Sequence, residues 1–409
     1  MTFNEKLAAF AELAVKVGVN IQPGQYLLIN TSVETLPFTR LVVDAAYKAG
    51  AGRVHVQLTD DFIARAFYEG GSEEEMAKYP KWIVAQRDEL IEEEGALLWI
   101  DAQDPDLLAG IPVERIATQQ KVGGEALANY RKAVMTDQIA WSIIAVPSEK
   151  WAAKVFAHLP EDEQMGAMWE AIFHTVRIGE GDAVAKWREH VANLESRAQQ
   201  LNDKRFKKLH YKAPGTALTI ELPDKHVWAS GSSKTPQDTT FIANMPTEEV
   251  YTMPAKYGVD GYVSNTKPLV YQGNIIDGFT LWFEGGKIVK AEAKVGNDLL
   301  QQLIQNDEGS SYLGEVALVP HKSPISSSNI LYYNTLFDEN ASNHLAIGAA
   351  YPTNYEGGRD LTEAQMEEKG INTSITHEDF MIGSGEMDID GELYDGTVEP
   401  IFRSGEWAF

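Results

Sequence analysis

A strand, a helix and a second strand follow one another near the start of the chain, and this order constrains its fold most. Residues 26–29 predict an apolar strand, residues 35–48 a helix and residues 53–58 a second strand. Strands joined by such a long crossover pair in parallel. Further strands are predicted at residues 96–100 and 139–146. We therefore expect the first half to be an α/β domain with an open, mostly parallel sheet.

The pattern changes after a charged, helix-favouring stretch between residues 182 and 208. Beyond it, residues 217–222 predict a strand, and residues 279–291 predict a hairpin that turns at Glu284-Gly285-Gly286. The second half is therefore expected to be an α+β domain rich in antiparallel pairing. A boundary near residue 205 divides the chain into predicted domains over residues 1–205 and 206–409.

Charge and cysteine content limit the chemistry of the chain. Its 35 Lys and Arg against 60 Asp and Glu give a formal net charge of −25, which repels nucleic acid and anionic membrane surfaces. With no cysteine, any metal must be held by oxygen and imidazole. The sequence shows no secretory signal and no apolar run of about 18 residues, so we expect a cytoplasmic protein.

Several common catalytic motifs are missing. The sequence contains no Gly-x-Ser-x-Gly nucleophile elbow and no His-Glu-x-x-His zinc signature. A serine hydrolase is thereby disfavoured. A metal peptidase would need ligands that are scattered along the chain.

Four segments of the second half place acidic residues or histidine beside turns and apolar runs, where ligands on rigid element ends are expected. In the first, Pro246 and Pro254 bracket the adjacent carboxylates Glu248 and Glu249 and restrict the backbone. In the second, Glu315 precedes an apolar, strand-like run, and an acid there needs a partner if it is buried.

The other two segments contain histidine. Glu339 and His344 are five residues apart, which would leave them on neighbouring faces of a helix, and Tyr351 follows. His377 and Asp379 are two apart, so they project to the same side of an extended chain and can hold one ion. The remaining histidines are interpreted as ordinary surface or core residues, with only His321 left open: His55, His158, His174, His190, His210 and His226.

Taken together, these segments resemble the M29 family of metallo-aminopeptidases, the group that includes aminopeptidases T and S. The resemblance covers essentially the whole chain and is carried by Asn-Met-Pro-Thr-Glu-Glu-Val, Leu-Phe-Asp-Glu-Asn-Ala-Ser-Asn-His and His-x-Asp-Phe-Met-Ile-Gly-Ser. It places the catalytic centre in the second predicted domain. The metal ligands that it implies are Glu249, Glu315, Glu339, His344, His377 and Asp379.

The resemblance also implies a function. It implies a homodimer that binds two divalent ions and removes N-terminal residues from peptide substrates with an activated water. Zinc, cobalt and manganese are all compatible with oxygen and imidazole ligands. Glu315 is our choice for a carboxylate that bridges the ions, and we favour Glu249 over Glu248 as a ligand. Glu248 and Tyr351 are the candidates for moving or donating protons.

Two other functions remain open from the residues themselves. A phosphoesterase also uses two metals held by Asp, Glu and His, but no Arg or Lys cluster near the candidate ligands would help to bind its anionic substrate. A binding protein with a structural metal would instead close the coordination sphere and leave no position for water.

Overall fold

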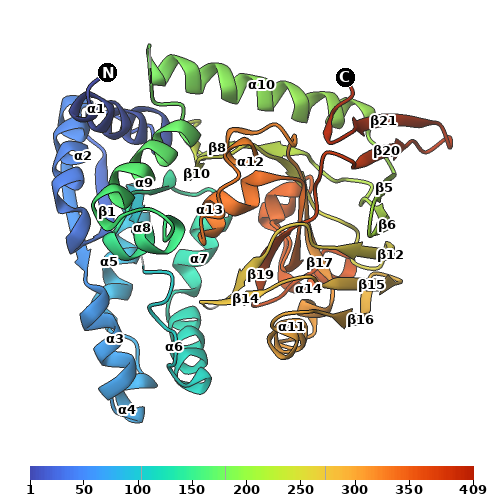
Figure 1. Ribbon diagram of the computed structural model, residues 1–409, viewed down its shortest axis with the longest axis horizontal. Coiled ribbons are helices and arrows are strands. Elements are labelled where there is room, and N and C mark those ends of the chain that lie inside the picture. Colours follow the sequence, from blue (N-terminus) through green and yellow to red (C-terminus); the bar gives the residue numbers. More distant parts are fainter. Residues whose placement is uncertain (103, 180, 272) are drawn as a thin grey trace. The chain divides into compact units, whose positions relative to one another are not determined.

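The computed structural model describes residues 1–102, 104–179, 181–271 and 273–409. Their contacts define two compact units, one made of Met1–His190 with Ser232–Pro246 and the other of Val191–Gly231 with Thr247–Phe409 (Figure 1). Helix α10 (Ala183–Lys204) begins in the first unit and ends in the second. The division into independent domains near residue 205 stays a prediction.

The first unit contains a five-stranded sheet in which every neighbouring pair is parallel, as expected. In spatial order its strands are β10 (Asn244–Met245), β4 (Trp141–Ala145), β3 (Ala96–Asp101), β1 (Tyr26–Ser32) and β2 (Arg53–Thr59). Strand β10 comes from the second half of the sequence and is too short to show a strand period. A small hairpin, β8 (Ser232–Lys234) with β9 (Thr240–Ile242), precedes it in the chain.

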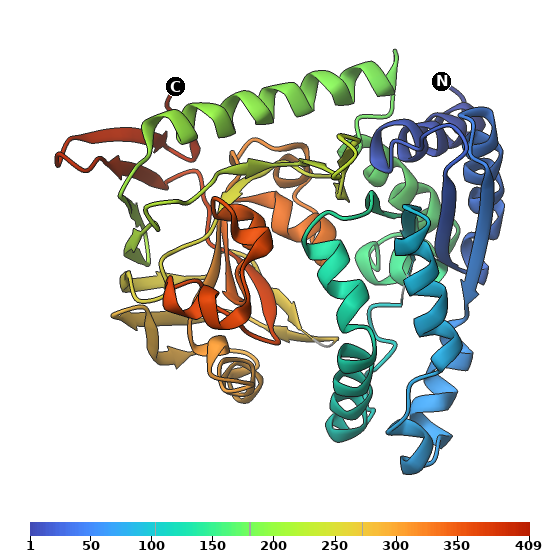
Figure 2. The same ribbon diagram turned by 180° about the vertical axis from the view of Figure 1, so that it is seen from behind.

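Helices accompany this sheet. The first begins at Thr2, whose side chain accepts from the backbone N–H of Glu5 in a capping box, and its Phe10 ring packs 5.3 Å from that of Phe38. Helices α4 (Glu73–Met76) and α5 (Lys81–Glu92) lie beside α6 (Val113–Ala126) and α7 (Ala128–Met135) (Figure 2). The helices of the unit before α10 are α1 (Phe3–Leu13), α2 (Leu36–Lys48), α3 (Asp61–Gly70), α4 (Glu73–Met76), α5 (Lys81–Glu92), α6 (Val113–Ala126), α7 (Ala128–Met135), α8 (Glu149–Val155) and α9 (Glu161–Thr175).

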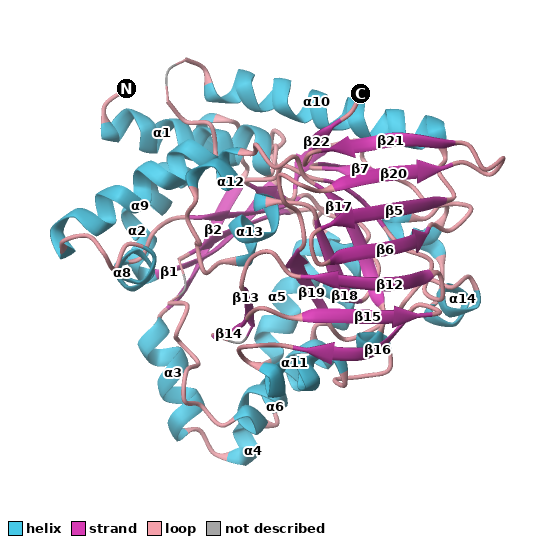
Figure 3. Ribbon diagram, turned by 45° about the vertical axis from the view of Figure 1, so that its right-hand side comes forward, coloured by secondary structure: helices cyan, strands magenta, loops and turns pink. Residues whose placement is uncertain are grey.

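The second unit is built on two antiparallel sheets, which confirms the α+β prediction (Figure 3). The larger has the order β16 (Lys287–Glu292), β15 (Thr280–Glu284), β12 (Val259–Ser264), β6 (Thr216–Glu221), β5 (Lys208–Ala213), β20 (Asp388–Glu392), β21 (Val398–Arg403) and β22 (Glu406–Trp407). The smaller has the order β19 (His377–Met381), β18 (His344–Gly348), β17 (Leu313–Leu318), β11 (Val250–Thr252) and β7 (Ala229–Ser230).

A hydrophobic core joins the two sheets of the second unit. It combines side chains of the larger sheet, such as Ile220 and Leu281, with Val316, Leu345 and Phe380 of the smaller one. The predicted hairpin is formed by β15 and β16. The other elements of the unit are the hairpin of β13 (Leu269–Tyr271) with β14 (Asn274–Ile276) and the helices α11 (Asn297–Ile304), α12 (Pro324–Ser328), α13 (Thr335–Asp338) and α14 (Glu363–Glu368).

Within the part of the chain that the structure describes, no helix has the length and apolar character needed to cross a bilayer.

Candidate metal centre

Strand alternation decides which side chains of the smaller sheet face away from the core. Val316, Leu345 and Phe380 point into the core, so the residues next to them point to the opposite face. Pairing aligns Glu315 with Ala346, and Ala346 with Asp379, in one row across β17, β18 and β19. The short side chain of Ala346 thus lies between the two carboxylates in this row.

His344 and His377 join the same face from neighbouring rows. His344 opens β18, two residues before Ala346, and His377 opens β19, two residues before Asp379. The prediction that His377 and Asp379 share one side of an extended chain therefore agrees with a strand here. Glu339 and His344 do not share a helix, because Glu339 begins a 3-10 turn, Glu339–Ala341, and His344 begins a strand.

A bulge in β17 sets the position of Glu315. The acid was expected to precede the strand, but it lies within it, and the register with β18 shifts between Leu313 and Glu315. Bulges of this kind redirect side chains. Gly314 is required in between, since a Cβ atom there would lie 2.3 Å from the carbonyl oxygen of Gly348.

Four contacts between carboxylates and imidazoles define two overlapping groups. His344 Nε2 lies 3.1 Å from Glu249 Oε2 and 3.5 Å from Glu315 Oε1. On the other side, His377 Nε2 lies 3.8 Å from Glu315 Oε2 and 3.7 Å from Asp379 Oδ1. In each group the donor atoms lie within 4.8 Å of one another, and Glu315 belongs to both: Glu249, Glu315 and His344 in one, and Glu315, His377 and Asp379 in the other.

Three more predicted site residues lie close to these groups without belonging to either. Glu339 is buried, and its pKa responds to the charges of Asp379 and Glu249. The ring of Tyr351 lies 4.9 Å from that of His377. Glu248 is buried next to Glu249 in the chain, and its backbone N–H donates to Asn340 Oδ1 at 2.8 Å.

Both histidines are oriented by the backbone. Nδ1 of His377 lies 2.7 Å from the carbonyl oxygen of Ala349, and Nδ1 of His344 lies 3.2 Å from that of Ser342. A carbonyl accepts only, so each Nδ1 donates its proton to the backbone and each Nε2 is the nitrogen that faces the carboxylates. This is the arrangement that a metal-binding histidine needs.

Burial of so many acids in one place shifts their pKa values. Desolvation, and then the charges of Asp379 and Glu249, raise the pKa of Glu315 to about 7 against the opposing hydrogen bond from His344. Desolvation also raises the pKa of Glu339 well above its usual value, with Asp379 adding to the effect. Negative charge is therefore concentrated here beyond what this part of the protein can solvate.

The basic and phenolic groups respond in the complementary way. Burial alone would lower the pKa of His344, but hydrogen bonds to Glu249 and Glu315 raise it well above the usual value. Asp379 and Glu315 likewise raise the pKa of His377 against desolvation. Desolvation and the charge of Glu315 raise the pKa of Tyr351 well above its usual range. The surroundings thus favour positive charge at this face.

The donor set fits divalent cations. Oδ1 of Asp379 is buried and has no hydrogen-bond partner among the described residues, and a buried acceptor in that condition calls for a ligand. Within the same described part, no Lys or Arg forms an ion pair with Glu249, Glu315, Glu339 or Asp379. Carboxylate and imidazole are ligands for zinc, cobalt and manganese.

Two asparagines hold the site together and were not singled out from the sequence. Asn340 is fully buried, accepts from the N–H of Glu248 and donates to Glu339 Oε1 at 3.3 Å. Asn343 accepts from the N–H of Val319 at 2.7 Å, just before His344. Their only sequence signal is that they lie next to candidate ligands.

The other histidines stay outside both groups in the described structure. His321 lies against Gly385 and Gly405, and its backbone N–H donates to the carbonyl oxygen of Gly405. His210 contacts Glu392, with its Nε2 at 2.7 Å from Oε2. These contacts are consistent with structural roles.

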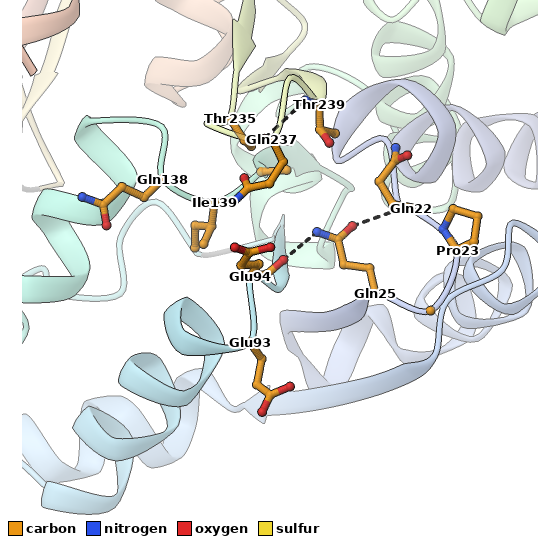
Figure 4. Close-up of a pocket in the computed structure, with 12 residues that line it drawn as sticks. Gln22, Pro23, Gln25, Glu93, Glu94, Gln138, Ile139, Thr235, Gln237 and Thr239 are labelled. Carbon is orange, nitrogen blue, oxygen red and sulfur yellow. Dashed lines mark hydrogen bonds between the residues drawn. The ribbon is translucent and has the colours of Figure 1, made fainter.

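A pocket of about 300 Å³ in the first unit offers no comparable donor set (Figure 4). It is lined mainly by Gln, Glu and Thr side chains. Gln25 donates to the carbonyl oxygen of Glu94 at 2.8 Å and accepts from the N–H of Gln22 at 3.0 Å, so the lining groups satisfy one another.

The sequence matches a known protein family over nearly its whole length. The model of the thermophilic metalloprotease (M29) family matches residues 3–407. The chain belongs to this family and is a hydrolase of peptide bonds, as the sequence resemblance implied.

Particular relatives match over nearly their full length. The chain is 50% identical to aminopeptidase AmpS of Bacillus subtilis (strain 168), with 100% of both covered. It is 48% identical to aminopeptidase 2 of Geobacillus stearothermophilus, with 100% of this chain and 98% of the relative covered. The solved structure of wild-type AmpT from Thermus thermophilus superimposes with a TM-score of 0.93 at 37% identity, with 100% of both chains covered. This similarity confirms the expected fold class.

Proposed function

We propose that the protein is a metal-dependent aminopeptidase that removes N-terminal residues from peptides at a site for two divalent ions. The observation that carries the proposal is the position of Glu315, which belongs to both donor groups and so can bridge two ions. Zinc, cobalt and manganese all suit the donors.

The residues divide between the two ions. Glu249 and His344 would hold one ion, and His377 and Asp379 the other, with Glu315 shared between them. Glu339, buried beside both groups, completes the ligand set. Its charge brings the carboxylates to four, which two divalent ions balance. An uncharged peptide bond suits such a neutral site better than a phosphate ester does.

When bound, the ions would supply Lewis acidity, lowering the pKa of water and polarising the scissile carbonyl. The protein supplies orientation and proton transfer. Hydrogen bonds from Nδ1 fix the imidazole of His377 on Ala349 and that of His344 on Ser342. Buried Glu248 would accept a proton from the attacking water and return it to the leaving amine. Tyr351, whose raised pKa keeps it protonated, would donate a hydrogen bond to the developing oxyanion.

An activity assay separates this proposal from its rivals. The purified protein should hydrolyse aminoacyl-4-nitroanilides, lose this activity with a chelator and regain it with added zinc, cobalt or manganese. Release of phosphate from 4-nitrophenyl phosphate would favour a phosphoesterase. Retention of metal without activity on either substrate would favour a structural metal.

The proposal includes a homodimer in the cytoplasm. It is supported by the family resemblance together with the formal charge of −25, which disfavours adhesion to nucleic acid and anionic membranes. Light scattering during size-exclusion chromatography should give twice the chain mass of 45.3 kDa. Fractionation of the source cells should recover the activity with cytoplasmic markers.

A further inference from the structure

The carboxylate of Asp307 accepts four hydrogen bonds although it lies outside the predicted site. Oδ1 accepts from the N–H of Ser310 at 2.8 Å, from the Ser310 hydroxyl at 2.6 Å and from the Ser374 hydroxyl at 2.7 Å. Oδ2 accepts from the N–H of Ile375 at 2.7 Å. Such a set stabilises the charged carboxylate, and the hydrogen bonds lower the pKa of Asp307 against the opposing effect of desolvation.

These donors come from the segments that lead into two ligand-bearing strands. Ser310 precedes β17, which carries Glu315, while Ser374 and Ile375 precede β19, which begins at His377. The two segments also touch directly. Asn372 donates to the carbonyl oxygen of Gly309 at 2.8 Å. The backbones also approach closely, since a Cβ atom on Gly309 would lie 2.0 Å from the carbonyl oxygen of Thr373.

The second segment in turn orients His377. The carbonyl oxygen of Thr376 accepts from the N–H of Ala349 at 2.7 Å, and the carbonyl oxygen of Ala349 lies 2.7 Å from His377 Nδ1. A shift of residues 374–376 would therefore move both the imidazole and the carbonyl that orients it. Glu249 and His344, in contrast, come from other segments of the chain and are not tied to Asp307 by any of these bonds.

We propose that Asp307 is a positioning residue that holds the strand bearing His377 and Asp379 in register and so sets the affinity for one of the two metal ions. This inference rests on the proposed function. Outer groups that orient metal ligands typically change metal affinity or activity by about 10- to 100-fold when removed. The affinity for the ion held by His377 and Asp379 should fall most. The affinity for the ion held by Glu249 and His344 should change less.

The test compares Asp307→Ala and Asp307→Asn with a matched control, Asp260→Asn. Asp260 Oδ1 accepts from the N–H of Gly285 at 2.8 Å in the β15–β16 turn, so the control also removes a carboxylate that holds backbone. Asn at residue 307 can keep the contacts of one oxygen but turns an N–H₂ group towards the N–H of Ile375 or the donors at Oδ1. It should therefore be the milder variant and remain folded if Ala does not.

Cobalt titration of metal-free protein, followed by isothermal calorimetry and visible absorption, is the primary measurement. In Asp307→Ala, one equivalent should bind about 10- to 100-fold more weakly, with an altered absorption band for that equivalent. Asp307→Asn should give a smaller shift in the same direction, and Asp260→Asn should match the wild type. At saturating cobalt, kcat on an aminoacyl-4-nitroanilide should largely recover in both variants at residue 307.

Hydrogen exchange in the metal-free state separates failure of this inference from failure of the proposed function. Residues 372–381 should exchange faster in Asp307→Ala than in the wild type. Unchanged exchange together with unchanged affinity for both equivalents would overturn the positioning role alone. Equally weakened binding of both cobalt equivalents would also contradict the positioning role. A wild-type protein that takes up no metal would overturn the proposed function and, with it, the role of Asp307 in metal affinity.

Discussion

His344 and Glu315 lie on adjacent strands, and His344 Nε2 is 3.5 Å from Glu315 Oε1. The second oxygen of the same carboxylate lies 3.8 Å from His377 Nε2 on the far strand. One glutamate therefore lies between two histidines whose other nitrogens are engaged by backbone carbonyls. Strands β17, β18 and β19 thus bring both imidazoles to a single carboxylate.

Removing either histidine should abolish catalysis without unfolding the protein. His344→Ala and His377→Ala should each lower kcat/KM by about 1,000-fold or more, because several kcal/mol of transition-state stabilisation depend on the ions. Steady-state hydrolysis of an aminoacyl-4-nitroanilide measures the loss, and circular dichroism checks the fold. The exposed His158 provides the control, and comparable activity in all three variants would contradict the site.

Tyr351→Phe should lower kcat while metal content stays at the wild-type level. The ring can keep its contact with His377 at 4.9 Å, so only the hydroxyl is lost, at an expected cost of about 100-fold. Tyr211→Phe is the matched control, since its buried hydroxyl has no hydrogen-bond partner among the described residues. Undiminished kcat in Tyr351→Phe would exclude a catalytic role for the phenol.

Asn340→Ala should weaken the site by releasing the neighbouring groups that Asn340 holds in place. The variant frees the N–H of Glu248 and one oxygen of Glu339, and we expect a 10- to 100-fold loss of activity or metal affinity. Asn202→Ala removes two similar bonds to the backbone of Trp228, at 2.9 and 2.8 Å. It should cost roughly 1–3 kcal/mol of stability but leave kcat/KM intact. Parallel losses of activity in both variants would show that Asn340 acts through stability alone.

The contribution of the ion pair between Lys256 and Glu367 to folding stability should depend on pH. Lys256 Nζ is buried and lies 2.7 Å from Glu367 Oε1, and this hydrogen bond is the main reason that the pKa of Glu367 is lowered, with desolvation opposing it. An acid with a depressed pKa stabilises the fold above its unfolded pKa, and this contribution is lost as the pH falls through the folded value.

Urea unfolding of Glu367→Gln across a pH series tests the direction of this pH dependence. At pH 7 the variant should be less stable than the wild type by about 1 kcal/mol, a modest value because Glu367 is partly exposed. The difference should shrink below the ordinary glutamate pKa of about 4.5 and vanish in stronger acid. A difference that grows as the pH falls would contradict the assignment.

Local patterns in the sequence were enough to predict much of the fold and the shared strand face of one candidate ligand pair. The crossover between residues 26 and 58 indicated the parallel sheet, and the turn at Gly285-Gly286 indicated the β15–β16 hairpin. The spacing of His377 and Asp379 indicated a shared strand face. The expectation that the six implied ligands converge rested on the family resemblance, since no spacing joins residues so far apart along the chain.

Features that depend on contacts between distant segments could not be predicted in this way. Strand β10 adds two residues to a sheet whose other strands all come from the first half of the sequence. Two residues are too few to show the alternating pattern of a strand. The bulge beside Glu315 arises from the close approach of Gly314 to Gly348. Asp307 is an ordinary polar residue in the sequence, and it is connected with the site by its bonds to Ser310, Ser374 and Ile375.

The most direct test of the account is the number of zinc ions that metal-free protein binds, measured by calorimetric titration of the wild type and of Glu315→Gln. Because Glu315 belongs to both donor groups, the wild type should bind two ions per chain, and the variant should lose tight binding of both. A wild type that binds fewer than two ions, or a Glu315→Gln variant that binds two with unchanged affinity, would contradict a shared carboxylate at the centre of the site.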